Sequence, residues 1–493
     1  MDPELQSREL MERPAFNKTR KKILWLLLLI GAVAAFCCLF VLNYIPGGFT
    51  WQEKSIDLAD GKRLLLSGKE LSLTAPDGKW LWKSDAGYKV QDAFATDLDG
   101  DGDEELIAIL WKRGRFGPAR PYWITSDEKK YSQHIFIYDI NEDGSVTQKW
   151  CASDIGPLVV RMKVMEKNSA ILLTEDAGGK ACLWSWQSFG LKNMDNGVSF
   201  ACFGDNIIHE EIYLYGESIA GGNYDFLYKP FRKDIQDADV SVIQLETMLV
   251  DKASAVGGYP SFGTPLDVGR AIADAGFDVA TCANNHSMDR GLYGIDVTMN
   301  FLRQNGITCV GLHSAYDSDN RPYKIITRNG INIALFAYTY GINDQGNEND
   351  FSFLLNGFPE GEEQEKEFVA DLKSARDEAD FVVVFAHWGQ EYEKEPNDYQ
   401  KHMAQLMAEG GVDVVVGTHP HVVQPVETIK RPDGGDMLVY YSLGNFRAGQ
   451  GFSEDTKTGA EALFTIEHCY DGVRLAGYEI KEIDAYWKDA LDN

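Results

Sequence analysis

The feature that most constrains the fold is an alternation of short apolar runs with amphipathic segments of helical period, from about Val198 to the C-terminus. This alternation is typical of an α/β layer architecture, in which helices cover the faces of a sheet. Six of the apolar runs end in polar side chains. They are "VSFACF" before Gly204-Asp205-Asn206, "DVSVIQL" before Glu246-Thr247, "DVATCA" before Asn284-Asn285-His286, "DFVVVFA" before His387-Trp388-Gly389, "VDVVVG" before Thr418-His419-Pro420-His421, and "MLVYYSL" before Gly444-Asn445-Phe446.

These polar residues are predicted to meet, although more than 200 residues of chain separate the first from the last. In an α/β sheet the carboxyl ends of the strands share one edge, and ligands bind there. For any single residue the simpler interpretation is a helix cap or a satisfied turn. For the set that interpretation is poor, because four of the nine histidines stand at these strand ends.

The residue types suit a divalent transition metal. Carboxylate, imidazole and amide oxygen are ligands for zinc, manganese or iron, and the pattern offers no thiolate of a structural zinc site. Two neighbouring ions can polarise a phosphoryl oxygen for in-line hydrolysis of a phosphoester. The imidazole of His286, next to a ligand, can protonate a leaving oxygen, and Asp289 is near enough in sequence to orient its ring. The predicted metal ligands are Asp205, Glu246, Asn285, His387, His419 and His421.

With these residues identified, the region from about 198 to 480 resembles the CapA family of capsule synthesis, also called the poly-γ-glutamate synthesis family. The fold of that family is similar to calcineurin-like metallophosphoesterases. The resemblance implies a four-layer α-β-β-α sandwich, metal binding by the six residues above, and His286 as the acid. The motifs that carry it are "FGDNIIH", "DVSVIQLETML", "FGTP", "ANNHSMDRG", "VVVFAHWGQEY", "GVDVVVGTHPHVVQPVE" and "YYSLGNF".

The sequence departs from the metallophosphoesterase pattern at two positions. That pattern begins Asp-x-His, whereas Ile207 stands two residues after Asp205 and the nearest imidazole belongs to His209. His209 is therefore a further, weaker ligand prediction. The bridging position holds Glu246 where an Asp is usual, which lengthens the side chain by one methylene. The number of ions, one or two, stays open at this point.

Residues 50–190 differ from the rest, because they form short β-segments separated by Gly, Asp and Asn turns. This pattern predicts an all-β domain, with a boundary near residues 191–197 before the domain of residues 198–480. The loop "DLDGDGDEELI" places carboxylates at alternate positions, a spacing that can bind calcium. It resembles the calcium loops of FG-GAP/VCBS propeller repeats, which implies a propeller-like domain; a solvated acidic turn is the alternative. The acidic residues are Asp97, Asp99, Asp101 and Asp103.

The run "ILWLLLLIGAVAAFCCLFVL", residues 23–42, is long enough to cross a bilayer, since 20 residues of helix span roughly 30 Å. Four basic residues precede it and no basic residue follows in "NYIPGGFTWQ". The positive-inside rule therefore predicts a cytoplasmic tail of residues 1–22, a transmembrane helix of residues 23–42, and an extracytoplasmic remainder. A cleaved signal peptide is the alternative, although this apolar core is longer than the usual one. The basic residues are Lys18, Arg20, Lys21 and Lys22.

The net charge of −28 argues against nucleic acid as the partner, because neutralising phosphates requires clustered Lys and Arg. The eight cysteines show no CxxC spacing, so neither a zinc ribbon nor a redox motif is predicted. Arg290 and Arg447 lie near motif ends, where a guanidinium can recognise an anionic substrate.

Three functions are consistent with these features. The first is a membrane-anchored, extracytoplasmic, metal-dependent hydrolase of the phosphoesterase type, acting on a phosphoester or polymer-linked substrate. The second is a metal-dependent factor that holds or transfers an anionic polymer, without hydrolysis, in a membrane biosynthesis complex. The third is a binding protein whose working module is the β-domain. Because every metal-type position is filled, the first two are favoured over the third.

Overall fold

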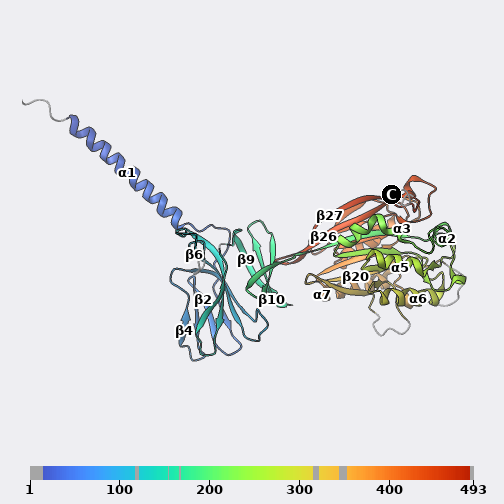
Figure 1. Cartoon of the computed structure of the whole chain (residues 1–493), viewed down its shortest axis with the longest axis horizontal. Coiled ribbons are helices and arrows are strands. Elements are labelled where there is room, and N and C mark those ends of the chain that lie inside the picture. Colours follow the sequence, from blue (N-terminus) through green and yellow to red (C-terminus); the bar gives the residue numbers. More distant parts are fainter. Residues whose placement is uncertain are drawn as a thin grey trace, which may run out of the picture. The chain divides into compact units, whose positions relative to one another are not determined.

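The computed structural model describes residues 15–116, 122–153, 155–165, 168–314, 321–343 and 352–488. Much of the predicted cytoplasmic tail, residues 1–14, lies outside the described residues. The chain divides into two compact units, residues 1–194 and 195–493. Figure 1 labels the main elements of each unit.

A single long helix, α1 (Ala15–Asn43), contains the predicted apolar segment. Its part from Lys22 to Asn43 has a mean hydropathy of 2.8 and is long and apolar enough to cross a membrane. The Asn43 side chain caps the end of the helix by donating to the carbonyl of Leu39 at 2.7 Å, and Pro46 follows. A retained anchor and a signal sequence both meet this description.

The first unit continues as three antiparallel sheets of four strands, each connected in sequence order, so the predicted all-β region is confirmed. The kind of β-domain, predicted as FG-GAP/VCBS-like, stays a prediction. The strands are β1 (Lys54–Asp57), β2 (Arg63–Ser67), β3 (Glu70–Thr74), β4 (Trp80–Lys83); β5 (Lys89–Thr96), β6 (Glu105–Arg113), β7 (Tyr131–Ile140), β8 (Val146–Cys151); and β9 (Val159–Met165), β10 (Asn168–Asp176), β11 (Ala181–Gln187), β12 (Gly190–Met194).

The middle sheet of this unit is buried on both faces. Successive side chains of a strand point to opposite faces, so the even-numbered apolar residues of β6 point one way and the odd-numbered ones the other. Leu106 and Leu110 pack in a core with the sheet β1–β4, while Ile107 and Ile109 pack in a second core with the sheet β9–β12. The continuous apolar run of β6 is therefore explained by burial on two sides.

The second unit contains two large mixed sheets. The first has the order β18-β17-β14-β13-β26-β27 with β25 beside β13, and the second the order β19-β20-β21-β22-β24-β23. The strands of the first are β13 (Gly197–Asn206), β14 (Val240–Leu245), β17 (Val279–Thr281), β18 (Thr308–Val310), β25 (Asn445–Arg447), β26 (Thr458–Cys469) and β27 (Gly472–Asp484). Those of the second are β19 (Tyr323–Arg328), β20 (Ile331–Thr339), β21 (Phe381–His387), β22 (Val414–Thr418), β23 (Val426–Lys430) and β24 (Asp436–Tyr440); β15 (Leu249–Val250) and β16 (Thr264–Pro265) form a small separate pair.

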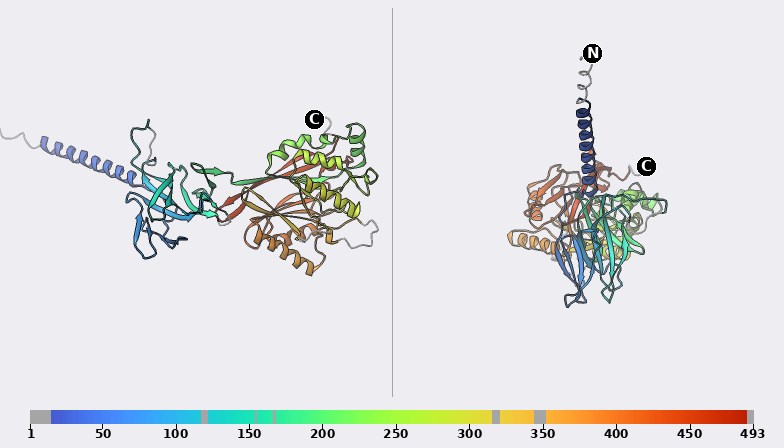
Figure 2. Two further views of the ribbon diagram at one scale, coloured as in Figure 1. Left: turned by 60° about the horizontal axis from the view of Figure 1, so that its bottom comes forward. Right: turned by 90° about the vertical axis from the view of Figure 1, so that its left-hand side faces the viewer.

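Helices cover the outer face of each sheet, as Figure 2 shows, and the predicted four-layer α-β-β-α sandwich is confirmed. The helices over the first sheet are α2 (Glu210–Ser218), α3 (Asp225–Tyr228), α4 (Arg232–Asp237), α5 (Leu266–Ala275) and α6 (Gly291–Gln304), and those over the second are α7 (Glu362–Glu378) and α8 (Asp398–Glu409). Shorter elements are α9 (Glu454–Lys457), η2 (Lys229–Phe231), η3 (Ala253–Ala255) and η4 (Ser352–Leu354).

Strand alternation assigns each apolar residue to one of three cores. In β13, Phe200 and Cys202 belong to the core between the sheets, whereas Phe203 packs under the helices of the first sheet. In β21, Val383 lies between the sheets and Val384 under α7 and α8. The strands β13, β14 and β17 are parallel, as are β20, β21 and β22, so within each sheet their carboxyl ends share one edge.

Candidate metal centre

Strand alternation carries two of the predicted ligands onto the inner faces of the sheets. Gln244 continues the between-sheet positions of β14, and Glu246 is the next residue of that phase, immediately after the strand. His387 occupies the corresponding phase at the last residue of β21. Both side chains therefore project into the space between the two sheets, because alternate residues of a strand point to the same face as the core residues that precede them.

Asp205 reaches the same side through a β-bulge. The pairing of β13 with β14 shifts register between Phe203 and Asp205, so Gly204 is the extra residue. A one-residue slip exchanges the two faces of a strand, and here it turns Asp205 away from the helix side occupied by Phe203. Gly204 is required because a Cβ at this position would lie 2.0 Å from the Gly444 carbonyl oxygen.

The Asp205 carboxylate contacts the turn after β22. Its Oδ2 accepts from the His419 backbone N–H at 3.0 Å and lies 3.1 Å from His421 Nδ1. Its Oδ1 is 3.8 Å from His387 Nδ1. His419 and His421 have φ of 96° and 58°, in the left-handed region that ordinary side chains avoid. Such strain is maintained at sites where the surrounding structure demands it.

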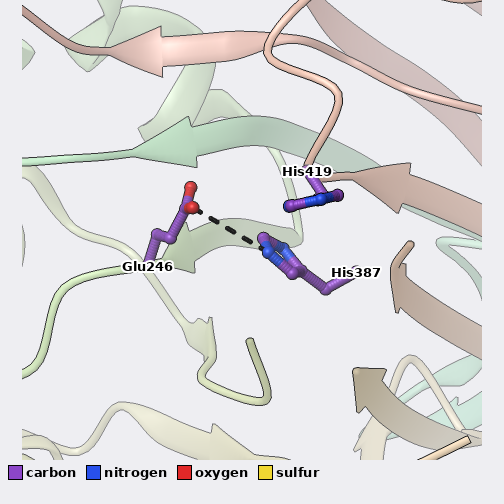
Figure 3. Close-up of side chains that lie close together, drawn as sticks. All are labelled: Glu246, His387 and His419. Carbon is purple, nitrogen blue, oxygen red and sulfur yellow. Dashed lines mark ion pairs between the residues drawn. The ribbon is translucent and has the colours of Figure 1, made fainter. Parts of the chain in front are cut away.

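Glu246 is the central group of the cluster and has no solvent exposure. Its Oε1 lies 3.8 Å from His387 Nε2, the pair drawn with a dashed line in Figure 3, and 3.9 Å from His421 Nε2. Neither carboxylate oxygen has a hydrogen-bond partner among the described residues. Burial, and then the negative charge of Asp205, raise the pKa of Glu246 well above its usual value.

Two histidines of the cluster, His387 and His419, have a lowered pKa, which favours the neutral imidazole. Burial, and then neighbouring histidines, lower the pKa of His387 well below its usual value and that of His419 to about 3. The Nδ1 atom of His419 is buried without a hydrogen-bond partner among the described residues. A neutral imidazole offers a lone pair, so orphaned nitrogen and carboxylate oxygens together fit a cation that would satisfy both.

The ligand atoms form three overlapping groups, in each of which they lie within 4.8 Å of one another. Two of the groups share Glu246, which is the arrangement needed for a carboxylate that bridges two ions. The groups are Glu246, His387 and His419; Asp205, Glu246 and His421; and Glu391, His419 and His421.

Asn285 joins the cluster through His387. Its Oδ1 lies 3.0 Å from His387 Nε2, and its backbone carbonyl accepts from the Asn343 N–H at 2.9 Å. On the other side of the His387 ring, Nδ1 lies 3.1 Å from Thr418 Oγ1 and 3.3 Å from Gln244 Nε2. Neither Gln244 nor Thr418 was predicted as a partner of His387, although both stand at the ends of strands.

His286 and Asp289 form a buried pair beside the cluster. His286 Nδ1 lies 2.7 Å from Asp289 Oδ2, which also accepts from the Phe262 backbone N–H at 2.7 Å. The Phe262 ring meets the imidazole edge-on, with centroids 4.8 Å apart. These contacts hold the ring in one orientation, and its Nε2 is within 3.4 Å of Asn343 Nδ2.

His209 lies outside all of the ligand groups found among the described residues. The Gly449 backbone N–H donates to its Nδ1 at 3.0 Å, so this nitrogen already uses its lone pair. Burial lowers the pKa of His209 to about 4, and its ring packs edge-on against Phe262. Ile207 is buried in the adjoining apolar cluster.

The two arginines near the motif ends bind backbone carbonyls. Arg447 is buried and donates to the carbonyls of Leu227 and Asp484. Arg290 donates to the carbonyls of Ala255 and Ser261, which secures the loop before β16. Their observed role is therefore to hold the backbone around the site.

In the first unit, three of the four predicted calcium ligands gather. Oxygens of Asp97, Asp99 and Asp101 lie within 4.8 Å of one another. Asp97 also accepts from the N–H groups of Gly100 and Gly102, as in an ordinary acidic turn, and Asp101 from that of Asp103. Lys149 Nζ lies 2.7 Å from Asp99 Oδ2, and this hydrogen bond lowers the pKa of Asp99. Calcium binding stays a prediction.

Two further residues of the cluster were not predicted individually, although the polar loop after His387 was expected to lie at the mouth of the site. Glu391 stands four positions after His387 in the motif "HWGQEY", and the polar residues of this motif were the sequence feature that could have indicated it. The Tyr340 ring lies 4.6 Å from that of His419, centroid to centroid, and comes from the loop after β20. Only the packing of that loop against the turn after β22 brings the tyrosine to the site.

Comparison with known proteins assigns a family to the region that contains this cluster. The profile described as "Bacterial capsule synthesis protein PGA_cap" matches residues 199–450. The PGA biosynthesis protein CapA of Bacillus subtilis (strain 168) is 31% identical over 219 residues, 44% of this chain and 53% of that protein. The capsule biosynthesis protein CapA of Bacillus anthracis is 32% identical over 198 residues, 39% of this chain and 45% of that protein.

The chain therefore spans about half the length of the curated relatives it matches. Among solved structures, the calcineurin-like phosphoesterase YfkN from Bacillus subtilis aligns with 59% of this chain and 91% of its own, at 14% identity and a TM-score of 0.36. A phosphatase from Mycoplasma pneumoniae aligns with 61% of this chain and 98% of its own, at 14% identity and a TM-score of 0.35. The profile match, which covers half of the chain and includes every ligand of the cluster, shows that this protein belongs to the bacterial capsule synthesis family PGA_cap.

Proposed function

We propose that this protein is a membrane-anchored, metal-dependent phosphoester hydrolase that acts outside the cytoplasm in the synthesis of a capsule polymer such as poly-γ-glutamate. Membership of the capsule synthesis family supports the biological process. The cluster of carboxylates and imidazoles supports the chemistry. The apolar helix with its preceding basic residues supports the location.

The observation that carries the proposal is the unpartnered carboxylate of Glu246. A buried carboxylate without hydrogen bonds is costly unless a positive charge compensates it. Among the described residues, the groups around its oxygens are the imidazoles of His387 and His421, and Asp205 adds further negative charge. Bound divalent cations would remove both costs, and Glu246 is shared by the two groups that would hold them.

The residues of the cluster have two kinds of proposed role. One or two ions of manganese, zinc or iron would be held by Asp205, Glu246, Asn285, His387, His419 and His421. When bound, these ions would supply Lewis-acid polarisation of a phosphoryl oxygen. Asp289 orients His286, and His286 Nε2 carries the proton to the leaving oxygen.

The test uses the full-length protein in detergent, with metal analysis and hydrolysis of bis(p-nitrophenyl) phosphate and p-nitrophenyl phosphate in the presence of Mn²⁺ or Zn²⁺. Glu246→Gln is expected to bind Mn²⁺ or Zn²⁺ more weakly than the wild type and to lose hydrolysis. The matched control is Glu461→Gln, which also changes a fully buried glutamate but one that pairs with Lys481, outside the cluster.

Metal bound in stoichiometric amount without turnover of either ester would favour the alternative, a non-hydrolytic role in polymer assembly. The absence of an imidazole at Ile207 supports keeping that alternative. Equal metal affinity and equal hydrolysis in Glu246→Gln and the wild type would contradict the proposed centre altogether.

Membrane anchoring is tested by fractionating cells that produce the protein with an N-terminal tag. The expected result is a tagged, full-length chain in the membrane fraction whose residues 51–493 are digested by protease added outside. A chain that has lost the tag and appears in the medium would show that the helix is a cleaved signal sequence.

A further inference from the structure

The loop after β21 brings a third carboxylate, that of Glu391, to the outer side of the metal cluster. The backbone N–H of the next residue, Tyr392, donates to the Pro420 carbonyl at 2.8 Å, between the two histidines of the turn. Gln424 secures the following residues by donating to the Glu393 carbonyl at 2.8 Å. Glu391 is thus fixed beside His419 and His421 by hydrogen bonds of the main chain.

The Glu391 side chain differs from the inner carboxylates in its exposure. It is half-buried, whereas Asp205 and Glu246 have no exposure. It forms no ion pair with a described lysine or arginine. Its oxygen lies within 4.8 Å of a nitrogen of His419 and of His421, and His419 Nδ1 is buried without a partner among the described residues.

Counting lone pairs shows that this outer group and the inner groups exclude each other. A neutral imidazole binds one ion through its one lone pair. The inner groups use His419 with Glu246 and His387, and His421 with Asp205 and Glu246. The outer group uses both histidines, so it can be filled only while the inner groups leave them free.

We propose, on the basis of the proposed metal centre, that Glu391, His419 and His421 form an outer, half-exposed binding position that captures a divalent cation before the inner ligands take it up. The two histidines then exchange Glu391 for the inner carboxylates, which solvent does not reach directly. Glu391 accordingly accelerates metal loading and is not a ligand of the fully loaded centre.

The kinetic test is the rate of cobalt loading in metal-free, full-length protein, followed by the visible absorbance of protein-bound Co²⁺. Glu391→Gln is expected to load at least about tenfold more slowly, the lower end of the effect of a local charge on an association rate. The final number of cobalt ions per chain is expected to equal that of the wild type. The control is Glu393→Gln, which removes the same charge two residues along the same loop. The Glu393 side chain is exposed and lies outside every ligand group among the described residues, so this variant is expected to load cobalt at the wild-type rate.

An equilibrium test examines the outer position by itself. In Glu246→Gln the inner groups lose their shared carboxylate, so His419 and His421 become available to Glu391. This variant is expected to retain one cobalt ion per chain, which the double variant Glu246→Gln/Glu391→Gln loses.

Equal loading rates in Glu391→Gln and the wild type would overturn the proposal, and so would retention of cobalt in the double variant. Loss of one ion from Glu391→Gln at saturation would also overturn it, by making Glu391 a permanent ligand. Failure of the wild type to bind cobalt would instead reject the metal centre itself, so the two failures are distinguishable.

Discussion

At the scale of single residues, the cluster combines side chains whose type was evident from the sequence with contacts that were not. The carboxylates of Asp205 and Glu246 lie 3.1–3.9 Å from the imidazoles of His387 and His421. The predicted pairing of His286 with Asp289 is present as a contact of 2.7 Å, and its role in catalysis stays a proposal. His209 was predicted as a weaker ligand from its nearness in sequence to Asp205; its Nδ1 accepts from the Gly449 N–H, and a role as a ligand stays a prediction.

His286→Ala separates catalysis from metal binding. Because His286 belongs to none of the ligand groups, the number of bound ions per chain is expected to stay the same. Hydrolysis of a phosphodiester is expected to fall by roughly 10²–10⁴-fold, the usual contribution of a general acid. Metal analysis and steady-state rates measured on one preparation check this, and a loss of metal would show that the imidazole is a ligand instead.

Asp289→Asn tests the orienting contact. The amide oxygen of asparagine can take the place of Oδ2 and accept from both the Phe262 N–H and His286 Nδ1, but it carries no negative charge, so the contact that orients the ring is weakened. We expect a smaller fall in the hydrolysis rate than for His286→Ala, with unchanged metal content. The His286→Ala/Asp289→Asn double variant should hydrolyse no more slowly than His286→Ala alone, since Asp289 acts through the imidazole. A clearly additive loss would assign Asp289 a separate role.

At the scale of secondary-structure elements, the period of two in β14 and β21 is sufficient to place Glu246 and His387 between the sheets. The same reasoning would place Asp205 under the helices, because it has the phase of Phe203. The bulge at Gly204 reverses this placement. It occurs where the Gly444 carbonyl, far away in sequence, approaches the strand, so no local pattern in "FACFGDN" could have predicted it.

Gly204→Ala is expected to damage the site through the backbone. An added Cβ would lie 2.0 Å from the Gly444 carbonyl oxygen, so the bulge must shift. We expect the metal-free protein to lose about 1–3 kcal/mol of unfolding free energy, as in overpacked cores, and the affinity for metal to fall as Asp205 moves. The control is Gly477→Ala, a strand glycine in β27 whose added Cβ would contact nothing within 4 Å. Denaturant unfolding and metal titration of both variants check the prediction, and equal stability of the two would contradict it.

At the scale of the whole molecule, the chain carries its chemistry in the unit of residues 195–493 and a separate stack of antiparallel sheets in residues 1–194. The continuous apolar run of β6 was consistent with a buried strand, and its burial on both faces comes from two neighbouring sheets. The family match spans residues 199–450, so it covers the cluster but not the first unit.

Metal is expected to stabilise only the second unit. A cation that binds the folded protein at a free concentration 100 times its Kd adds about 2.7 kcal/mol to the free energy of unfolding. In differential scanning calorimetry of the full-length protein, adding Mn²⁺ or Zn²⁺ after EDTA treatment should raise the Tm of one transition and leave the other unchanged. In metal-free protein, Glu246→Gln should unfold at a higher temperature than the wild type, because it removes an uncompensated buried carboxyl group. A lower Tm for this variant would mean that the carboxylate has a structural role without metal.

Local sequence is enough to predict the fold class of both units, the apolar helix and the types of side chain at the strand ends. These features depend on hydrophobic periodicity and on residue type, and both can be read from residues that are neighbours in the sequence. Four further features are set by the folded chain: the face that Asp205 takes, the hydrogen bonds of Arg290 and Arg447 to backbone carbonyls, the hydrogen bond from Gly449 to His209, and the position of Glu391 beside His419 and His421. Each of these depends on contacts between segments distant in sequence, and the geometry of a ligand group is set by such contacts to within a few ångströms.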